Sequence, residues 1–312
     1  MSGYSKGYKP FPMRIQVQPG SEAEYLHYQR CRRYCGAEPA RTALAPGAAP
    51  SPQDDLIFRG GKTIAQAGFQ NIYLGRPADF SAGDVDRIDA AITAAIQDRR
   101  LTNVIQQYLD TQPLSWDVVP SVQLDETRPF ELNEPDVQSK IIDLFDQGLI
   151  HGADHDRTIF NLVLPPGTVL RLDDSSSLRG LGGYHGSVHF FRGGLPRTLY
   201  YSANVYSERR FTGTNGIVAF DAPWKNVVGT LYHEMVEFQT DPDVGDAIRT
   251  NDLDLIGWNS DFGQEIGDQP ISANLLSDVF REIETEKKVT VPVQFMYSNA
   301  VHGAEGPIDA PH

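Results

Sequence analysis

Cysteine is scarce in this 312-residue chain, in which Cys31 and Cys35 are the two cysteines and lie four residues apart. A chain of this length can bury a large core without covalent cross-links, so its stability needs no disulfide framework. On a helix the spacing would place both thiols on one face. Two cysteines specify little more, and we interpret them as reduced thiols in a short helix.

Long apolar runs are also missing. No stretch approaches the roughly 18 consecutive apolar residues that predict a membrane-spanning helix. The first 30 residues contain no apolar segment of the kind that forms the centre of a signal peptide. We therefore expect no membrane partner and a cytoplasmic location, with secretion as the alternative.

Basic residues are outnumbered, with 27 Lys and Arg against 41 Asp and Glu, a formal net charge of −14 and a pI near 4.9. A surface of this charge repels phosphate backbones and anionic lipid. The composition argues against nucleic acid as a partner and favours a small-molecule or peptide substrate. It does not predict an oligomeric state.

The pattern along the chain predicts an α+β protein in two parts. Residues 1–55 form an N-terminal arm that contains a helix at 22–35 and an Ala/Pro-rich linker from Ala37 to Asp55. Residues 56–312 form one catalytic domain, with a sheet-bearing part at 56–240 and a C-terminal part at 241–312. The polar segment His151–Asp156 is interpreted as a loop.

Apolar periodicity places the main elements of this domain. Strands are expected at 70–75, 158–165, 186–191, 198–207 and 216–220, and helices at 84–109, as one helix or a pair, and at 134–150. A further helix follows, capped by Asp221, with Pro223 in its first turn and its end at Thr240–Pro242.

This last helix carries the sequence LYHEMVEFQTDP. A zinc peptidase helix would read His-Glu-x-x-His, but Glu237 stands where the second histidine would be. His233 and Glu237 are one turn apart on the same face, so an imidazole nitrogen and a carboxylate oxygen can converge on one ion. Glu234 points slightly aside, as suits a general base. The alternative is a solvated helix face.

Two flanking segments add candidate residues. Downstream, Glu265 and Asp268 lie in a glycine-punctuated loop about 30 residues past His233, a separation from which a third metal ligand is often supplied. A turn or capping role is the alternative for Asp268. Upstream, His185 and His189 share one face of an expected strand and could line a cleft, or be ordinary turn and strand residues.

Four ordered blocks carry a resemblance to a known family. They are GGYHG (182–186), YHEMVEFQTDPD (232–243), GWNSDFGQEIGD (257–268) and QFMYSNA (294–300), within about residues 180–302. The chain resembles the exordium-type and related bacterial and fungal zincin-like metallopeptidase-like proteins. Unlike those relatives, which are usually secreted, it lacks cysteines near the first and third blocks.

The resemblance implies a zincin-like fold, in which a twisted mixed sheet packs on an active-site helix beside a smaller C-terminal subdomain. It implies that His233 and Glu237 are metal ligands, that Glu234 is the base and that Glu265 or Asp268 is the remaining ligand. We expect zinc, with iron or manganese as alternatives. Because an extra anionic ligand lowers the Lewis acidity of the ion, hydrogen-bond donors to a developing oxyanion gain importance, and the candidates are Tyr184, His185 and Tyr201.

Three hypotheses about function follow. The first is a metal-dependent hydrolase of a peptide, amide or ester bond, with Glu234 as general base on metal-bound water. The second is a non-hydrolytic metal enzyme of small-molecule metabolism (a lyase, a cyclase or a non-haem iron oxygenase), in which His185 joins His233 and Glu237. The third is an inactive binding protein that keeps the zincin fold. The presence of Glu234 favours an enzyme.

Overall fold

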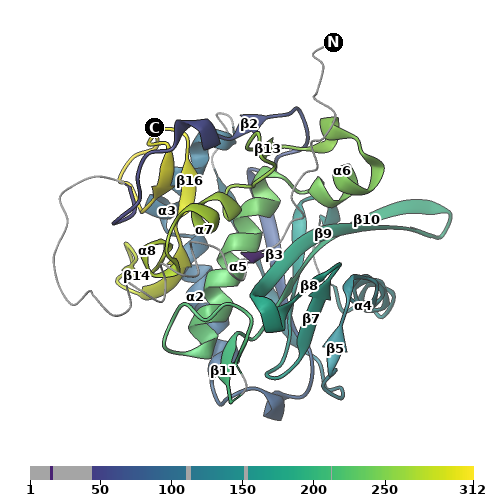
Figure 1. Cartoon of the computed structure of the whole chain (residues 1–312). Helices are drawn as coiled ribbons and strands as arrows, with labels where there is room; N and C mark the ends of the chain where they lie inside the picture. The colour runs from purple at the N-terminus through teal and green to yellow at the C-terminus, as the bar shows by residue number, and fades with distance from the viewer. Residues whose placement is uncertain (1–14, 17–43, 110–113, 151–153, 212) are drawn as a thin grey trace.

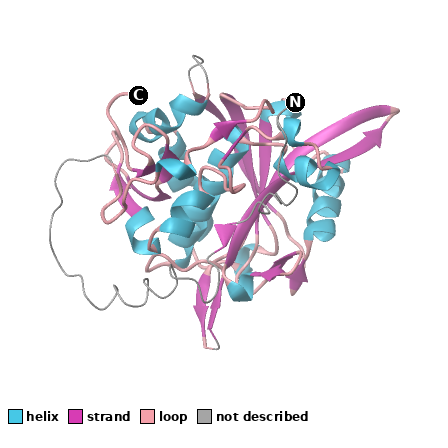
Figure 2. Ribbon diagram, turned by 45° about the horizontal axis from the view of Figure 1, so that its top comes forward, coloured by secondary structure: helices cyan, strands magenta, loops and turns pink. Residues whose placement is uncertain are grey.

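The computed structural model describes residues 15–16, 44–109, 114–150, 154–211 and 213–312. These residues form a mixed α+β structure with several sheets and seven α-helices, which confirms the expected α+β class (Figures 1 and 2). None of these helices is both long and apolar enough to cross a membrane. The expected helix at 22–35, with both cysteines, lies outside the described residues.

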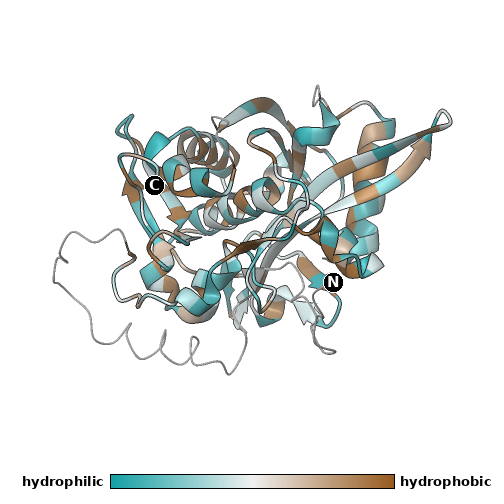
Figure 3. Cartoon of the chain, turned by 90° about the horizontal axis from the view of Figure 1, so that it is seen from above, coloured by the Kyte–Doolittle hydropathy of each residue, from teal (hydrophilic) through white to brown (hydrophobic). Residues whose placement is uncertain are grey.

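The largest described sheet has the strand order β1-β9-β10-β6-β3-β4. β1 pairs with β9 and β9 with β10 in antiparallel fashion, whereas β10, β6, β3 and β4 are parallel neighbours. The bounds are β1 Ile15–Gln16, β9 Leu181–Arg192, β10 Leu195–Asn204, β6 Thr158–Val163, β3 Gln66–Tyr73 and β4 Ser115–Gln123. The hairpin of β9 and β10 projects from the body (Figures 1 and 3).

Helices cover both faces of this sheet, which explains why β6 is buried at every position. α4 (Glu134–Asp146) packs on one face through Val137, Ile141 and Leu144. α2 (Asp84–Ile96) and α5 (Pro223–Thr240) contribute to the core on the other face. The expected helix at 84–109 is a pair, since α3 (Arg99–Ile105) follows α2.

The central element is α5, which runs between the large sheet and the C-terminal part of the chain (Figure 1). It is buried at every residue from Asn226 to Thr240, so its polar side chains also lie inside the protein. The expected helix and its end at Thr240 are confirmed. The expected cap is wrong: Ala222 is the N-cap, and Asp221 instead pairs with Lys225 at 2.8 Å.

The start of α5 is held by a buried asparagine. The Asn226 Oδ1 atom accepts hydrogen bonds from the N–H groups of Ala219 and Phe220, and its Nδ2 donates to the Ser207 carbonyl. These bonds also explain why the strand expected at 216–220 is absent: three of its N–H groups, those of Ile217, Ala219 and Phe220, donate to side chains rather than to a neighbouring strand. Instead, β11 (Glu208–Arg210) and β12 (Gly213–Asn215) form a short hairpin before it.

The C-terminal part packs on α5 opposite the large sheet, mainly through β15 (Thr290–Gln294). α2 is another direct neighbour of α5. Residues 44–58 run along it, where the Ala45 N–H donates to the Ala304 carbonyl. The remaining elements are α6 Val244–Thr250, α7 Asp268–Ala273, α8 Leu276–Val279, β2 Ile57–Phe58, β5 Glu131–Leu132, β7 Val169–Leu172, β8 Ser175–Ser176, β13 Trp258–Asn259, β14 Phe280–Glu284, β15 Thr290–Gln294, β16 Met296–Ser298 and β17 Gly303–Glu305.

The contacts of Asn226 predict a stability effect. Asn226→Ala leaves two N–H groups and one carbonyl without their partner, so we expect the free energy of unfolding to fall by roughly 2–4 kcal/mol. Urea denaturation of the variant and of the unaltered protein measures the difference. An unchanged unfolding midpoint would contradict the role given to this side chain.

Candidate metal centre

The candidate centre lies around the C-terminal half of α5. This helix supplies His233, Glu234 and Glu237, and β9 supplies His185; all four side chains have an exposed fraction of 0%. Glu265, with an exposed fraction of 1%, lies in the segment before α7, and Asp268, at 14%, is the first residue of α7. Asp268 is therefore the side through which solvent approaches the group.

His233 is held by an amide side chain. Its Nδ1 lies 2.9 Å from Gln294 Oε1, and the Gln294 Nε2 group donates to the Gly267 carbonyl at 2.6 Å. Because that carbonyl can only accept, the amide orientation is fixed and His233 Nδ1 must carry the proton. In the neutral imidazole, Nε2 is then the atom with the lone pair that a metal can bind, and it lies 3.0 Å from Glu237 Oε1 and 3.8 Å from Asp268 Oδ1. It makes no aligned hydrogen bond, as expected for atoms that converge on a third partner.

His185 is held in the same way by the main chain. Its Nε2 lies 3.2 Å from the Asp241 carbonyl oxygen, which can only accept, so this nitrogen carries a proton. The other ring nitrogen, Nδ1, faces Glu234 Oε2 at 3.2 Å and Glu237 Oε2 at 3.7 Å. A histidine whose outer nitrogen bonds to a carbonyl while its inner nitrogen faces carboxylates is typical of a metal ligand.

Glu237 is the residue common to both histidines. His233 approaches its Oε1 atom and His185 its Oε2 atom. The N–H groups of Gly267 and Asp268 donate to Oε1 at 3.1 and 3.2 Å and hold the carboxylate in place, whereas Oε2 has no hydrogen-bond partner. Two groups of potential ligands result, His233–Glu237–Asp268 and His185–Glu234–Glu237, each with its ligand atoms within 4.8 Å of one another.

The basic side chains that face these carboxylates are the two histidines, His185 and His233. Within the described residues, no arginine or lysine pairs with Glu234, Glu237 or Glu265, and neither oxygen of Glu265 has a hydrogen-bond partner. A buried ion without a partner costs several kcal/mol. The carboxylates must therefore bind protons or a metal cation.

The pKa shifts of the polypeptide alone show the same constraint. Burial opposes protonation of His233, but Glu237 and Glu234 raise its pKa to about 10. The pKa of His185 also lies above its ordinary value, because the attraction of Glu234 and Glu237 exceeds the effect of burial. Burial raises the pKa of Glu234 and lifts that of Asp241 to about 8. Burial and the neighbouring carboxylates raise the pKa of Glu265 well above its usual range.

Comparison with protein-family models, with curated proteins and with solved structures finds no match. The fold and the candidate site are therefore described from this chain alone. The similarity to exordium-type proteins stays an expectation that rests on the four sequence blocks.

The structure distinguishes between the candidate third ligands. Asp268 joins His233 and Glu237 in one group and is also the first residue of α7. Glu265 instead approaches His185 Nε2 at 3.7 Å and belongs to neither group. The two histidines fall in different groups, and no group of potential ligands in the described part of the chain combines two imidazoles with one carboxylate.

The tyrosines expected at the site lie elsewhere. Tyr184 is next to His185 in β9, and successive strand residues point to opposite faces of a sheet. Tyr184 and Tyr201 therefore pack together in the core on the α4 side, where Tyr201 Oη bonds to Gln138. The expectation that either tyrosine donates to an oxyanion at the site is corrected. His189 also stays apart, with Nε2 2.6 Å from Asp246.

Two supporting groups were missed at the sequence level. Gln294 begins the QFMYSNA block, and Asp241 lies in TDP, so both were in recognised segments without an assigned role. The distance along the chain between His233 and Gln294 is 61 residues, and nothing in the local pattern links them.

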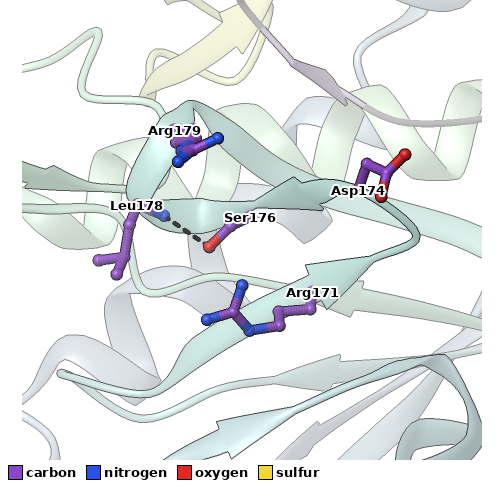
Figure 4. Close-up of a pocket in the computed structure, with 5 residues that line it drawn as sticks. All are labelled: Arg171, Asp174, Ser176, Leu178 and Arg179. Atoms are coloured by element: carbon purple, nitrogen blue, oxygen red, sulfur yellow. Dashed lines mark hydrogen bonds between the residues drawn. The ribbon is translucent and has the colours of Figure 1, made fainter.

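A surface pocket elsewhere contains none of these residues. It has a volume of about 240 Å³ and is lined by Arg171, Asp174, Ser176, Leu178 and Arg179 (Figure 4). The Ser176 hydroxyl accepts a hydrogen bond from the Leu178 N–H at 3.3 Å. This pocket includes no histidine, cysteine or buried acid–base pair and adds nothing to the candidate chemistry.

The close approach of Gly267 predicts a sensitive position. A Cβ atom there would lie 2.5 Å from His233 Nδ1 and 2.9 Å from Glu237 Oε1. We expect Gly267→Ala to displace the imidazole and to lower the free energy of unfolding by roughly 1–3 kcal/mol. Ser272→Ala, on the exposed side of α7, is the matched control. Equal unfolding curves for the two variants would contradict the packing described here.

Proposed function

We propose that the protein is a metal-dependent hydrolase of a peptide, amide or ester bond, with zinc as its ion and iron or manganese as alternatives. The observation that carries the proposal is the Nε2 atom of His233, which is buried and directed at Glu237 and Asp268 while Gln294 holds the other ring nitrogen. Nitrogen and carboxylate oxygen are ligands that zinc accepts. The four sequence blocks and α5 beneath a mixed sheet also support a zincin-like fold of the exordium-type family.

The roles follow from the contacts. His233, Glu237 and Asp268 would hold the ion, and Gln294 keeps the imidazole in the required tautomer. The bound ion supplies Lewis acidity, which polarises a carbonyl and acidifies water. Glu234 accepts the proton that the attacking water loses and passes it to the leaving group. The acyl product thereby gains a hydroxyl group and the leaving group gains a hydrogen atom. The Glu234 Oε1 atom is buried without a hydrogen-bond partner and is available for this transfer.

A second function is favoured by the burial of the group. Structural metal sites are closed, whereas catalytic sites keep an open position. His185, His233, Glu234 and Glu237 are all fully buried, and only the Asp268 side of the two groups is exposed. A metal centre that stabilises a binding protein without turnover accounts for this burial.

The first test separates base from ligand. We expect Glu234→Gln to keep the ion at His233 but to lower hydrolysis of a peptide or ester panel at least about 100-fold, because the amide cannot accept the proton. His233→Ala should lose that ion. Metal analysis and kcat are measured on the same preparations, with His189→Ala as the control. Retained turnover in the Glu234 variant would refute its role as base.

The second test concerns the metal itself. A cation that neutralises buried carboxylates binds the folded state alone, so chelation should lower the melting temperature and added zinc should restore it. Calorimetry measures both temperatures. A restored melting temperature without hydrolysis of any substrate in the panel would favour the structural centre, and a melting temperature unchanged by chelator and zinc would contradict both functions.

A further inference from the structure

Glu237 presents one carboxylate oxygen to each histidine, so it could bind one ion beside His233 and another beside His185. We propose that His185, Glu234 and Glu237 form a second divalent-cation site, and that Glu237 bridges the two ions. The proposal rests on the proposed function for its first ion. The second site uses a different histidine and a different carboxylate oxygen.

The ligand atoms of the second site face one another inside the protein. His185 Nδ1 lies 3.2 Å from Glu234 Oε2 and 3.7 Å from Glu237 Oε2, and the three residues are fully buried. Glu237 Oε2 has no hydrogen-bond partner. The Asp241 carbonyl holds the far side of the imidazole, so that Nδ1 is directed at the two carboxylates. An unpartnered carboxylate oxygen that faces a fixed imidazole nitrogen is an arrangement that can bind a cation between the two atoms.

The unpartnered oxygens give a further geometric reason. Glu237 Oε2 and both carboxylate oxygens of Glu265 are buried without a hydrogen-bond partner. Within the described residues, no arginine or lysine pairs with Glu234, Glu237 or Glu265, so a bound cation would supply the positive partner that the side chains around it do not. Glu265, 3.7 Å from His185 Nε2, adds negative charge just outside the second ligand set.

The ligand chemistry defines the class of ion. One imidazole and two carboxylates suit zinc or manganese, and carboxylates are common ligands of paired ions. Glu234 would bind through Oε2, the oxygen beside His185, while Oε1 keeps the role of proton acceptor. The second site therefore places a positive charge beside the base rather than replacing it.

The experiment counts bound metal. The full chain is loaded with manganese or with zinc, dialysed, and analysed by mass spectrometry, and the manganese form is also examined by electron paramagnetic resonance. We expect about two equivalents per chain and a spin-coupled manganese signal in the unaltered protein, and about one equivalent without coupling in His185→Gln. His189→Ala, on the same strand but bonded to Asp246, should keep both ions.

The outcomes separate the two proposals. About one equivalent in the unaltered protein, or two in His185→Gln, would overturn the second site and leave the hydrolase proposal standing. No bound metal would overturn both. Because the unaltered protein supplies its own count and its own resonance signal, the result does not depend on whether the His185 variant folds.

Discussion

The structure depends on how negative charge is neutralised at the end of α5. Carboxylates from that helix and from the segment before α7 are buried together, and within the described residues no lysine or arginine pairs with Glu234, Glu237 or Glu265. Main-chain N–H groups of Gly257, Gly267 and Asp268 satisfy some of the oxygens. The remaining atoms require protons or cations, so the folded state and its bound ions are energetically linked.

Three separate segments make this arrangement possible. α5 fixes the spacing of His233 and Glu237, β9 of the large sheet presents His185, and the C-terminal part supplies Asp268 and Gln294. α5 is buried from Asn226 to Thr240 because both β9 of the large sheet and β15 of the C-terminal part pack against it. The packing of the sheet and of the C-terminal part against α5 therefore positions the ligands. A substitution that disturbs either packing contact should also displace the ligand side chains.

The elements predicted best are those with strong local signals. The proline near the start of α5 and the proline after its end predict the bounds that this helix has in the structure, and the helix expected from residue 134 is observed as α4. The errors arise where side-chain contacts override the local pattern. α5 has no side-chain cap in place of Asp221, and Asn226 bonds the backbone of the supposed strand at 216–220. A contact of this kind leaves no periodic trace.

The sequence by itself determined the α+β class, the helix that bears the motif and the shared face of His233 and Glu237, because each follows from the repeat of a single element. The tertiary structure decided the rest. It turned Tyr184 away from His185, grouped Asp268 rather than Glu265 with His233, and brought His185 to the second oxygen of Glu237. These outcomes depend on packing between segments far apart in the chain, which local spacing does not encode.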